Sequence, residues 1–510
     1  MTNMIHIDTR FNRAIRYIIR MKVMTKPTLI LAMLLTLAVC MNSHAENLPD
    51  IGDAAGRILT PTDEHQIGAQ FYRRLQQSVT LVDDPEINQY LRALGLSLVS
   101  NSDNPFQPYL FFVVDDPTVN AFAAPGGYIG IHSGLIFAAR NEGELASVLA
   151  HEIAHITQRH IARAIEAQTK STPLNTAALL AAILLGASGN GQAATAAVAT
   201  VVAGSAQSSI NFTRANEKEA DRAGITILAR SNINPGAMAD FFGRLEQISR
   251  VNKSSLPEFL RTHPVTQSRI ADSRARADQY TNQHKELGRK DSEYFQLIKA
   301  RLRVLLADDK KNILRQFESE ANKKNASTST QYGYALALTQ RGQYSKARKI
   351  LNTLLAQSPD DNHYVSALAK VELGDNNNTG AIKLLAGSLE LNPHNHAVTL
   401  NYAKALLLAN KAQDARKLLQ THLRRSQPQR ASGVQFALTY KLLAQALGKT
   451  GATIEAHEAL AEYYLLSGNN SGAIEQLEIA VKLAERQDNL AAQRIEARLE
   501  QLQPKQDEKG

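Results

Sequence analysis

Apolar side chains recur every three to four residues across 142–165, which is the spacing of one face of an α-helix. The positions on this face are Leu145, Val148, Leu149, Ile153, Ile156 and Ile161. Comparable patterns predict further helices at 64–76, 85–100, 216–231, 236–251 and 265–280. The first half of the chain is therefore predicted to be mainly helical, organised around the helix at 142–165.

Two runs between these helices, 109–114 and 128–132, have strand-like sequences, and the turn residues 125–127 precede the second run. Two interpretations of the second run stay open. It is an ordinary hairpin strand, or it is an edge strand that takes an extended peptide by strand addition. That substrate-binding strand would consist of Tyr128, Ile129, Gly130 and Ile131. For 46–282 we expect an α+β domain with the central helix beside a small sheet.

The segment 174–206 consists largely of alanine, leucine, valine and glycine, and the sequence at 186–191 divides it into two short pieces. Each piece is shorter than the roughly 20 apolar residues that span a bilayer. We expect two small-residue helices packed as a hairpin over or beside the central helix. A loop that touches a membrane is the alternative, and no stable transmembrane span is expected.

A period of 34 residues runs through the second half of the chain. It relates Ala335, Ala369 and Ala403, then Ala347, Ala381 and Ala415, and then Leu351, Leu385 and Leu419. Small residues repeated at this period are typical of tetratricopeptide repeats. The pattern recurs only 17 residues after Ala444, at Ala461, so one helix is expected to serve two neighbouring pairs. We predict an all-α solenoid at 283–503, with a concave surface for other proteins, and a disordered tail at 504–510.

The formal net charge of +9 is concentrated at the start of the chain. Residues 1–45 contain six bases and one acid, which leaves 51 bases against 47 acids, a net +4, in the remainder. So small an excess over more than 450 residues gives no electrostatic footprint for nucleic acid. No nucleic-acid partner is expected.

Residues 1–45 have the features of a secretory signal peptide with an N-terminal extension. A basic region at Lys22 and Lys26 precedes an apolar run at 28–39, and Ser43 and Ala45 provide small residues for cleavage. A lipid anchor on Cys40 is the alternative. If cleavage follows Ala45, the mature chain contains no cysteine and therefore no disulfide. The chain is expected to be exported to the periplasm.

The central helix contains the motif His-Glu-x-x-His at 151–155. Residues four apart lie on one helix face, so His151 and His155 could hold a single zinc ion, with Glu152 beside it as general base. The alternative is that the two histidines are ordinary residues of a helix surface. A hydrolytic zinc site also needs a third protein ligand and an open position for water.

Glu217 is the expected third ligand. Asp221 follows it by four residues, which is about one helical turn. Asp221 could accept the outer N–H of a ligand histidine, or could merely make a contact within its own helix. Glu219 is the rival ligand, but its side chain faces away from Asp221. His160 follows His155 by five helical residues, some 140° around the helix, so we expect it to point elsewhere.

The expected reaction is peptide-bond hydrolysis with one Zn²⁺ per chain. Glu152 would take a proton from the attacking water and pass it to the leaving amine. His263, in the sequence Thr-His-Pro, allows three interpretations. It could stabilise the oxyanion, block the metal as a fourth ligand, or be a simple loop histidine.

These motifs resemble the zinc metalloproteases related to CAAX prenyl proteases and heat-shock membrane proteases. The resemblance rests on the sequences at 120–123, 125–127, 151–155, 216–221 and 262–264. It implies that Glu217 is the third ligand, Asp221 the supporting acid and His263 a regulatory fourth ligand.

Because the chain combines a predicted signal peptide with tetratricopeptide repeats, it resembles most the periplasmic members of this metalloprotease family. The resemblance implies a function in quality control of outer-membrane β-barrel proteins, including chaperone-like promotion of their maturation and degradation of stalled substrates. The repeats are implied to dock on the barrel-assembly machinery. The competing hypothesis is a tetratricopeptide chaperone or adaptor whose zinc site is structural and proteolytically silent.

Overall fold

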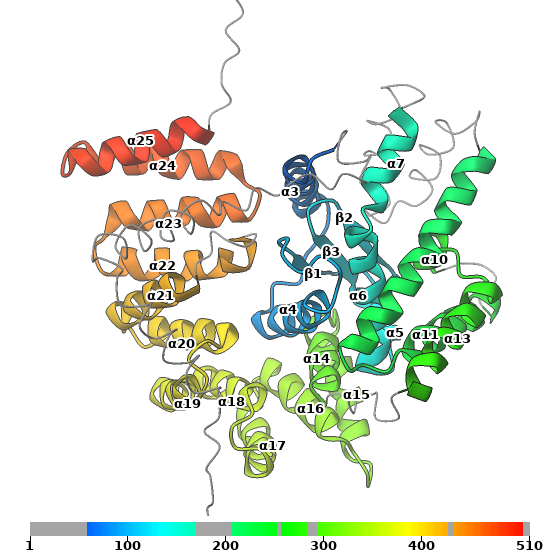
Figure 1. Cartoon of the computed structure of the whole chain (residues 1–510). Helices are drawn as coiled ribbons and strands as arrows, with labels where there is room; N and C mark the ends of the chain where they lie inside the picture. Colours follow the sequence, from blue (N-terminus) through cyan, green and yellow to red (C-terminus); the bar gives the residue numbers. More distant parts are fainter. Residues whose placement is uncertain (1–58, 170–205, 252–256, 284–292, 427–432, 503–510) are drawn as a thin grey trace, which may run out of the picture. The chain divides into compact units, whose positions relative to one another are not determined.

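The computed structural model describes residues 59–169, 206–251, 257–283, 293–426 and 433–502. The signal peptide, the tail at 504–510 and, apart from residue 206, the alanine-rich segment lie outside these ranges. Within them, no helix is both long and apolar enough to span a membrane. The fold class is confirmed: a mainly helical chain with one small sheet, followed by paired helices (Figure 1).

The first part of the described chain contains nine helices and three strands. They are α3 (Pro61–Ser78), α4 (Pro85–Val99), β1 (Leu110–Val114), β2 (Ala121–Ala124), β3 (Tyr128–His132), α5 (Ser133–Ala138), α6 (Glu142–Thr157), α7 (His160–Thr169), α10 (Ala206–Arg230), α11 (Gly236–Val251), α12 (Glu258–Thr262) and α13 (Gln267–Gln283). Asp84 caps α4 by accepting hydrogen bonds from the N–H groups of Glu86 and Ile87.

The sheet has the strand order β1-β3-β2, with β3 parallel to β1 and antiparallel to β2. Of the two interpretations of 128–131, the edge strand is wrong, because β3 is paired on both sides and all its residues are buried, whereas its hairpin with β2 is present. The turn before β3 requires glycine at position 127. The φ angle of Gly127 is +90°, and a Cβ atom there would clash with the carbonyl oxygen of Pro108. The edge strand that contacts α6 is β2.

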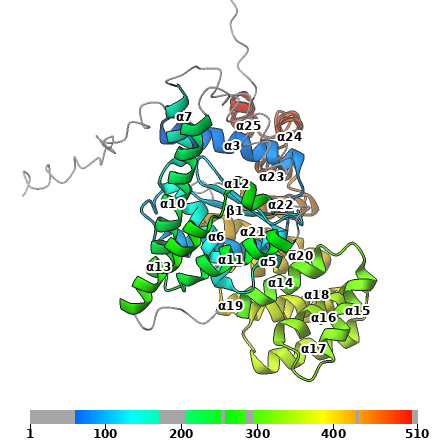
Figure 2. The same ribbon diagram turned by 90° about the vertical axis from the view of Figure 1, so that its right-hand side faces the viewer.

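Helix α6 is enclosed by other elements, and its residues are buried without interruption from Glu142 to Ala154. It packs against α4, α10, α11 and the strands β2 and β3. Figure 1 and Figure 2 both show α6 running beside α10. Asn141 begins the helix by accepting a hydrogen bond from the Glu144 N–H. The central helix is thus fixed on all sides, which makes it a rigid support for its polar side chains.

The prediction of one continuous helix at 142–165 is wrong, because α6 ends at Thr157 and α7 begins at His160. Arg159 has a φ of +52°, a left-handed conformation that is uncommon for a residue other than glycine. Its side chain donates to the Leu59 carbonyl oxygen at 2.6 Å and to Glu64 at 3.2 Å. These contacts hold the break in place.

The second part of the chain forms the predicted series of paired helices. They are α14 (Glu293–Leu305), α15 (Lys310–Ala321), α16 (Thr328–Gln340), α17 (Tyr344–Gln357), α18 (Asn362–Gly374), α19 (Asn378–Leu391), α20 (His396–Leu408), α21 (Ala412–Ser426), the 3₁₀ turn η3 (Gly433–Phe436), α22 (Ala437–Lys449), α23 (Thr453–Leu466), α24 (Asn470–Ala484) and α25 (Asn489–Leu502). All nine residues that define the 34-residue period are buried. Helix α23 packs against both α22 and α24, as the half-repeat predicts.

Arg301 of α14 joins the repeats to the first part of the chain. Its guanidinium forms two hydrogen bonds of 2.8 Å with Asp84, pairs with Glu86, and donates to the Tyr332 hydroxyl at 3.1 Å. Asn401 of α20 donates to Glu86 at 2.9 Å. One face of α14 packs into the core around α6, and its other face packs into the first repeat helices.

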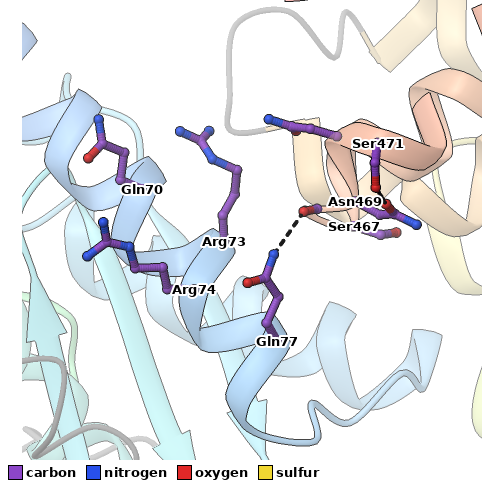
Figure 3. A pocket seen from close by; sticks show the side chains of 9 residues that line it. Gln70, Arg73, Arg74, Gln77, Ser467, Asn469 and Ser471 are labelled. Atoms are coloured by element: carbon purple, nitrogen blue, oxygen red, sulfur yellow. Dashed lines mark hydrogen bonds between the residues drawn. The ribbon is translucent and has the colours of Figure 1, made fainter. Parts of the chain in front are cut away.

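A second contact lies between α3 and the turn from α23 to α24, beside an open pocket (Figure 3). Gln76 donates to the Leu466 carbonyl oxygen at 3.3 Å, and Gln77 donates to that of Gly468 at 3.5 Å. Later repeat helices thus also contact the part of the chain that contains α6.

Candidate metal centre

His151 and His155 lie one turn apart on α6 and direct their Nε2 atoms toward each other, 3.0 Å apart. Glu217 reaches them from α10, with its carboxylate oxygens 3.4 Å from each of these two nitrogens. His151 and Glu217 are almost fully buried. The structure therefore brings together the two motif histidines and the glutamate that the sequence favours.

His263, the residue that follows α12, completes the cluster. Its Nδ1 lies 3.3 Å from Nε2 of His151 and 3.0 Å from Oε1 of Glu217. The ring stacks on Phe259, with the ring centres 4.9 Å apart. Phe259 in turn donates its backbone N–H to the Val119 carbonyl oxygen at 2.9 Å, which ties α12 to the segment before β2.

These four side chains fit a tetrahedral metal ion. One ligand atom of each lies within 4.8 Å of the others. Ligands about 2.0–2.1 Å from a tetrahedral zinc are separated from one another by roughly 3.3 Å. The separations of 3.0–3.4 Å between these nitrogens and oxygens agree with that value. Three nitrogens and one carboxylate are also donors that zinc accepts.

Asp221 and Arg269 lie behind the cluster. Asp221 Oδ1 is 3.0 Å from Nδ1 of His151, the nitrogen that faces away from Glu217. Arg269 of α13 forms two hydrogen bonds of 2.7 Å with Asp221 and lies 2.9 Å from Glu217. It also donates to the Pro264 carbonyl oxygen at 2.8 Å, so one guanidinium contacts both acids and the loop that bears His263.

His160 lies next to the cluster, so the prediction that it points elsewhere is wrong. Its Nδ1 is 2.9 Å from Nδ1 of His155, and its Nε2 is 3.2 Å from Glu219. The left-handed residue Arg159 turns the chain and returns His160 to the side of His155. Glu219 also pairs with Arg163 at 3.0 Å, and it is absent from the group of four convergent side chains.

Glu152 is buried beside the cluster, and its Oε1 lies 3.7 Å from Nε2 of His263. Its Oε1 has no hydrogen-bond partner among the described residues. Burial raises the pKa of this carboxyl. An unpartnered carboxylate oxygen next to four ligand atoms is suited to exchange a proton with a small molecule bound there.

The two motif histidines have opposite pKa shifts. Burial lowers the pKa of His155 to about 3. Burial also acts to lower the pKa of His151, but contacts with Asp221 and Glu217 outweigh it and raise the value to about 10. Burial opposes ionisation of Glu217 as well, yet the neighbouring histidines hold its pKa well below the usual range. Without a metal, therefore, a proton on His151 balances the buried carboxylates.

Sequence reasoning missed two parts of this site. Arg269 is one of several arginines in a polar helix, and nothing in the local sequence distinguishes the buried one. His160 is recognisable only if the helix is known to break at Arg159. Neither residue has a spacing that would indicate its contacts.

Comparisons with known proteins agree with this geometry. Residues 85–277 match peptidase family M48, and 317–371 and 372–435 match a tetratricopeptide repeat family. The β-barrel assembly-enhancing protease of Escherichia coli (strain K12) is 37% identical over 94% of this chain and 96% of its own. A putative β-barrel assembly-enhancing protease of Vibrio cholerae is 36% identical over 93% of this chain and 97% of its own.

A more distant relative matches the protease part alone. The mitochondrial metalloendopeptidase OMA1 of Schizosaccharomyces pombe is 32% identical over 31% of this chain and 43% of its own. The fold, the site and these relatives define a metalloendopeptidase. The chain belongs to the family of β-barrel assembly-enhancing proteases, which it matches over nearly its whole length.

Proposed function

We propose that the chain is a periplasmic zinc endopeptidase that degrades misfolded or stalled outer-membrane β-barrel proteins and also assists their maturation. The single observation that carries the enzymatic part is the convergence of His151, His155, Glu217 and His263 within 4.8 Å beside Glu152. The β-barrel substrate class rests on the names of the two full-length relatives. The periplasmic location rests on the signal-like sequence at 1–45.

In this proposal His151, His155 and Glu217 hold the zinc ion. When bound, zinc lowers the pKa of a water molecule and polarises the substrate carbonyl. Glu152 takes the proton from the attacking water through its unpartnered Oε1 and delivers it to the leaving amine. Asp221 fixes the orientation of the His151 ring from behind.

In the resting protein His263 would be the fourth residue that holds the ion. Its nitrogen lies as close to Glu217 and His151 as the other ligands lie to each other, which supports a regulatory fourth ligand. It must then move before a water molecule and a substrate can enter. After that movement it could donate to the oxyanion.

The substrate strand is reassigned to β2. A peptide cannot add to Tyr128–Ile131, because both edges of β3 are already paired. β2 contacts α6 and is paired with a strand on one side only, so a peptide that adds to its other edge would be aligned near the metal centre by main-chain hydrogen bonds. The repeats would supply a separate docking surface for the barrel-assembly machinery.

Glu152→Gln tests the reaction. The variant should retain one zinc per chain and lose cleavage of casein, because the amide cannot accept the proton. Glu217→Ala should lose both zinc and cleavage, whereas Glu219→Ala should still bind one zinc at saturating metal. Unchanged proteolysis by Glu152→Gln would reject the mechanism.

The substrate class needs its own test. An outer-membrane β-barrel protein held unfolded in urea and then diluted should be cleaved, and the same protein refolded in detergent should resist. Equal cleavage of both forms would contradict selection of stalled barrels while leaving the peptidase assignment intact.

A further inference from the structure

The two ligand histidines of α6 have different partners on their outer nitrogens. Nδ1 of His151 faces the Asp221 carboxylate at 3.0 Å. Nδ1 of His155 instead faces another imidazole, that of His160, at 2.9 Å. The far nitrogen of His160 lies 3.2 Å from Glu219. His155 is thus connected to a carboxylate through one additional ring.

Hydrogen-bond chemistry assigns the protons along this chain. A carboxylate only accepts, so the Nε2 of His160 that faces Glu219 must donate. A neutral imidazole carries one hydrogen, and the Nδ1 of His160 must therefore accept. The hydrogen between the two rings then sits on Nδ1 of His155. Its Nε2 is left with a free lone pair, directed at the site where His151 and Glu217 converge.

We propose that His160 and Glu219 act as a positioning relay for the metal ligand His155. Glu219 fixes the tautomer of His160, and His160 fixes both the tautomer and the ring orientation of His155. The inference deepens, and rests on, the proposed zinc site. Outer partners of this kind orient a ligand histidine and make it a stronger donor, and their loss weakens metal binding.

Two neighbouring arginines stabilise the positions of His160 and Glu219. Arg163 donates to Glu219 at 3.0 Å, which keeps that carboxylate ionised and in place next to His160. Arg159 adopts its left-handed conformation at the residue immediately before His160 and is fixed there by Leu59 and Glu64. An unstrained helix would carry His160 away from His155. The local backbone strain therefore serves the contact between the two rings.

The test is the zinc dissociation constant of the full-length protein, measured by competition with a chromophoric chelator. His160→Ala should weaken zinc binding by about 10–100-fold, the usual effect of losing an outer partner. His160→Asn should restore most of that affinity, because its side-chain oxygen can accept the hydrogen from His155. Equal weakening in both variants would overturn the relay, since it would indicate a loss of packing.

Glu219→Gln tests the relay at a more exposed position. The Glu219 side chain is 39% exposed, so we expect the variant to fold normally. It should weaken zinc binding less than His160→Ala does but in the same direction. The matched control is Lys218→Gln, an adjacent exposed residue of α10 that should bind zinc like the unmodified chain. Identical affinity in Glu219→Gln and Lys218→Gln would also overturn the relay.

These measurements separate the two proposals. If the unmodified chain does not bind one zinc, the proposed function fails. If the unmodified chain binds zinc and cleaves casein, and the His160 and Glu219 variants bind zinc equally well, only the relay fails.

Discussion

Arg269 and Asp221 form a two-point ion pair in the interior, with both N–O distances at 2.7 Å. The same guanidinium lies 2.9 Å from Glu217. In the metal-free site Arg269 is thus a buried cation shared by two adjacent carboxylates, beside the protonated His151. Because Arg269 contacts both acids, we expect its loss to change both the free energy of unfolding and the metal site.

Replacing Arg269 by methionine should destabilise the metal-free chain by about 3–5 kcal/mol, because Asp221 and Glu217 lose the buried guanidinium that they share. Urea unfolding followed by circular dichroism measures the change. Arg276→Gln is the control, since its side chain is 36% exposed and, among the described residues, pairs with Asp272 of the same helix. Zinc should reduce the difference between Arg269→Met and the unmodified chain, because its charge compensates the same carboxylates. A loss as small as that of Arg276→Gln would contradict this account.

His263→Ala should raise the basal rate of casein cleavage, because removing the ring opens the fourth position around the metal. Initial rates at saturating zinc measure the effect. His394→Ala provides a control histidine on an exposed position of the repeats. A drop of about 10²–10³-fold would instead identify His263 as an oxyanion donor.

Arg301→Met should destabilise the whole described chain by about 3–5 kcal/mol, because Asp84 and Glu86 would remain buried without a cation. The midpoint of thermal unfolding should fall for both the protease part and the first repeats. Arg303→Gln removes a more exposed pair with Glu320 and should cost less than about 1 kcal/mol. Equal shifts in the two variants would show that the Arg301 contacts do not join the two parts energetically.

Acid should destabilise the repeats through His396 and His422, whose facing nitrogens are 2.8 Å apart. Burial lowers the pKa of His396 to about 3 and that of His422 to about 4. Both rings are thus neutral in the folded chain but protonate in the unfolded chain below about pH 6.5. Because the unfolded state then binds more protons, stability is full above pH 6.5 and declines as the pH falls toward 4 and 3.

Each ring adds at most about 1.4 kcal/mol per pH unit to that decline. Urea unfolding at pH 7, 6 and 5 should show a shallower decline for His396→Gln than for the unmodified chain. Gln413→Asn, at an exposed and non-titrating position of α21, should leave the slope unchanged. Parallel slopes for all three proteins would refute the assignment.

The parts of the fold that were predictable from sequence are those set by local periodicity. The helical face of 142–157 and the four-residue spacing of Glu217 and Asp221 each lie within a few turns of one helix. The 34-residue period fixes the helix pairs in the same way, through small residues at each crossing. These patterns can be recognised in the sequence because they involve residues close together in one helix or one repeat.

The failures concern contacts between distant or unusually bent segments. The pairing of β3 with β1 is parallel and joins residues 18 positions apart across the intervening strand β2, so no turn sequence indicates it. The break at Arg159 lacks the glycine that normally marks a left-handed residue. Arg269 looks like its exposed neighbours in α13. Each of these features is decided by tertiary contacts.

The break at Arg159 also changes which length variants the site can tolerate. Adding or removing one residue between His155 and His160 would turn the second ring by about 100° and separate it from both His155 and Glu219. The unit that must keep its length is therefore the ten-residue segment 151–160, twice as long as the His-Glu-x-x-His motif itself. Grafting only the five-residue motif into another helix would transfer the two proposed metal ligands but not the contact with His160 that is proposed to fix the tautomer of the second.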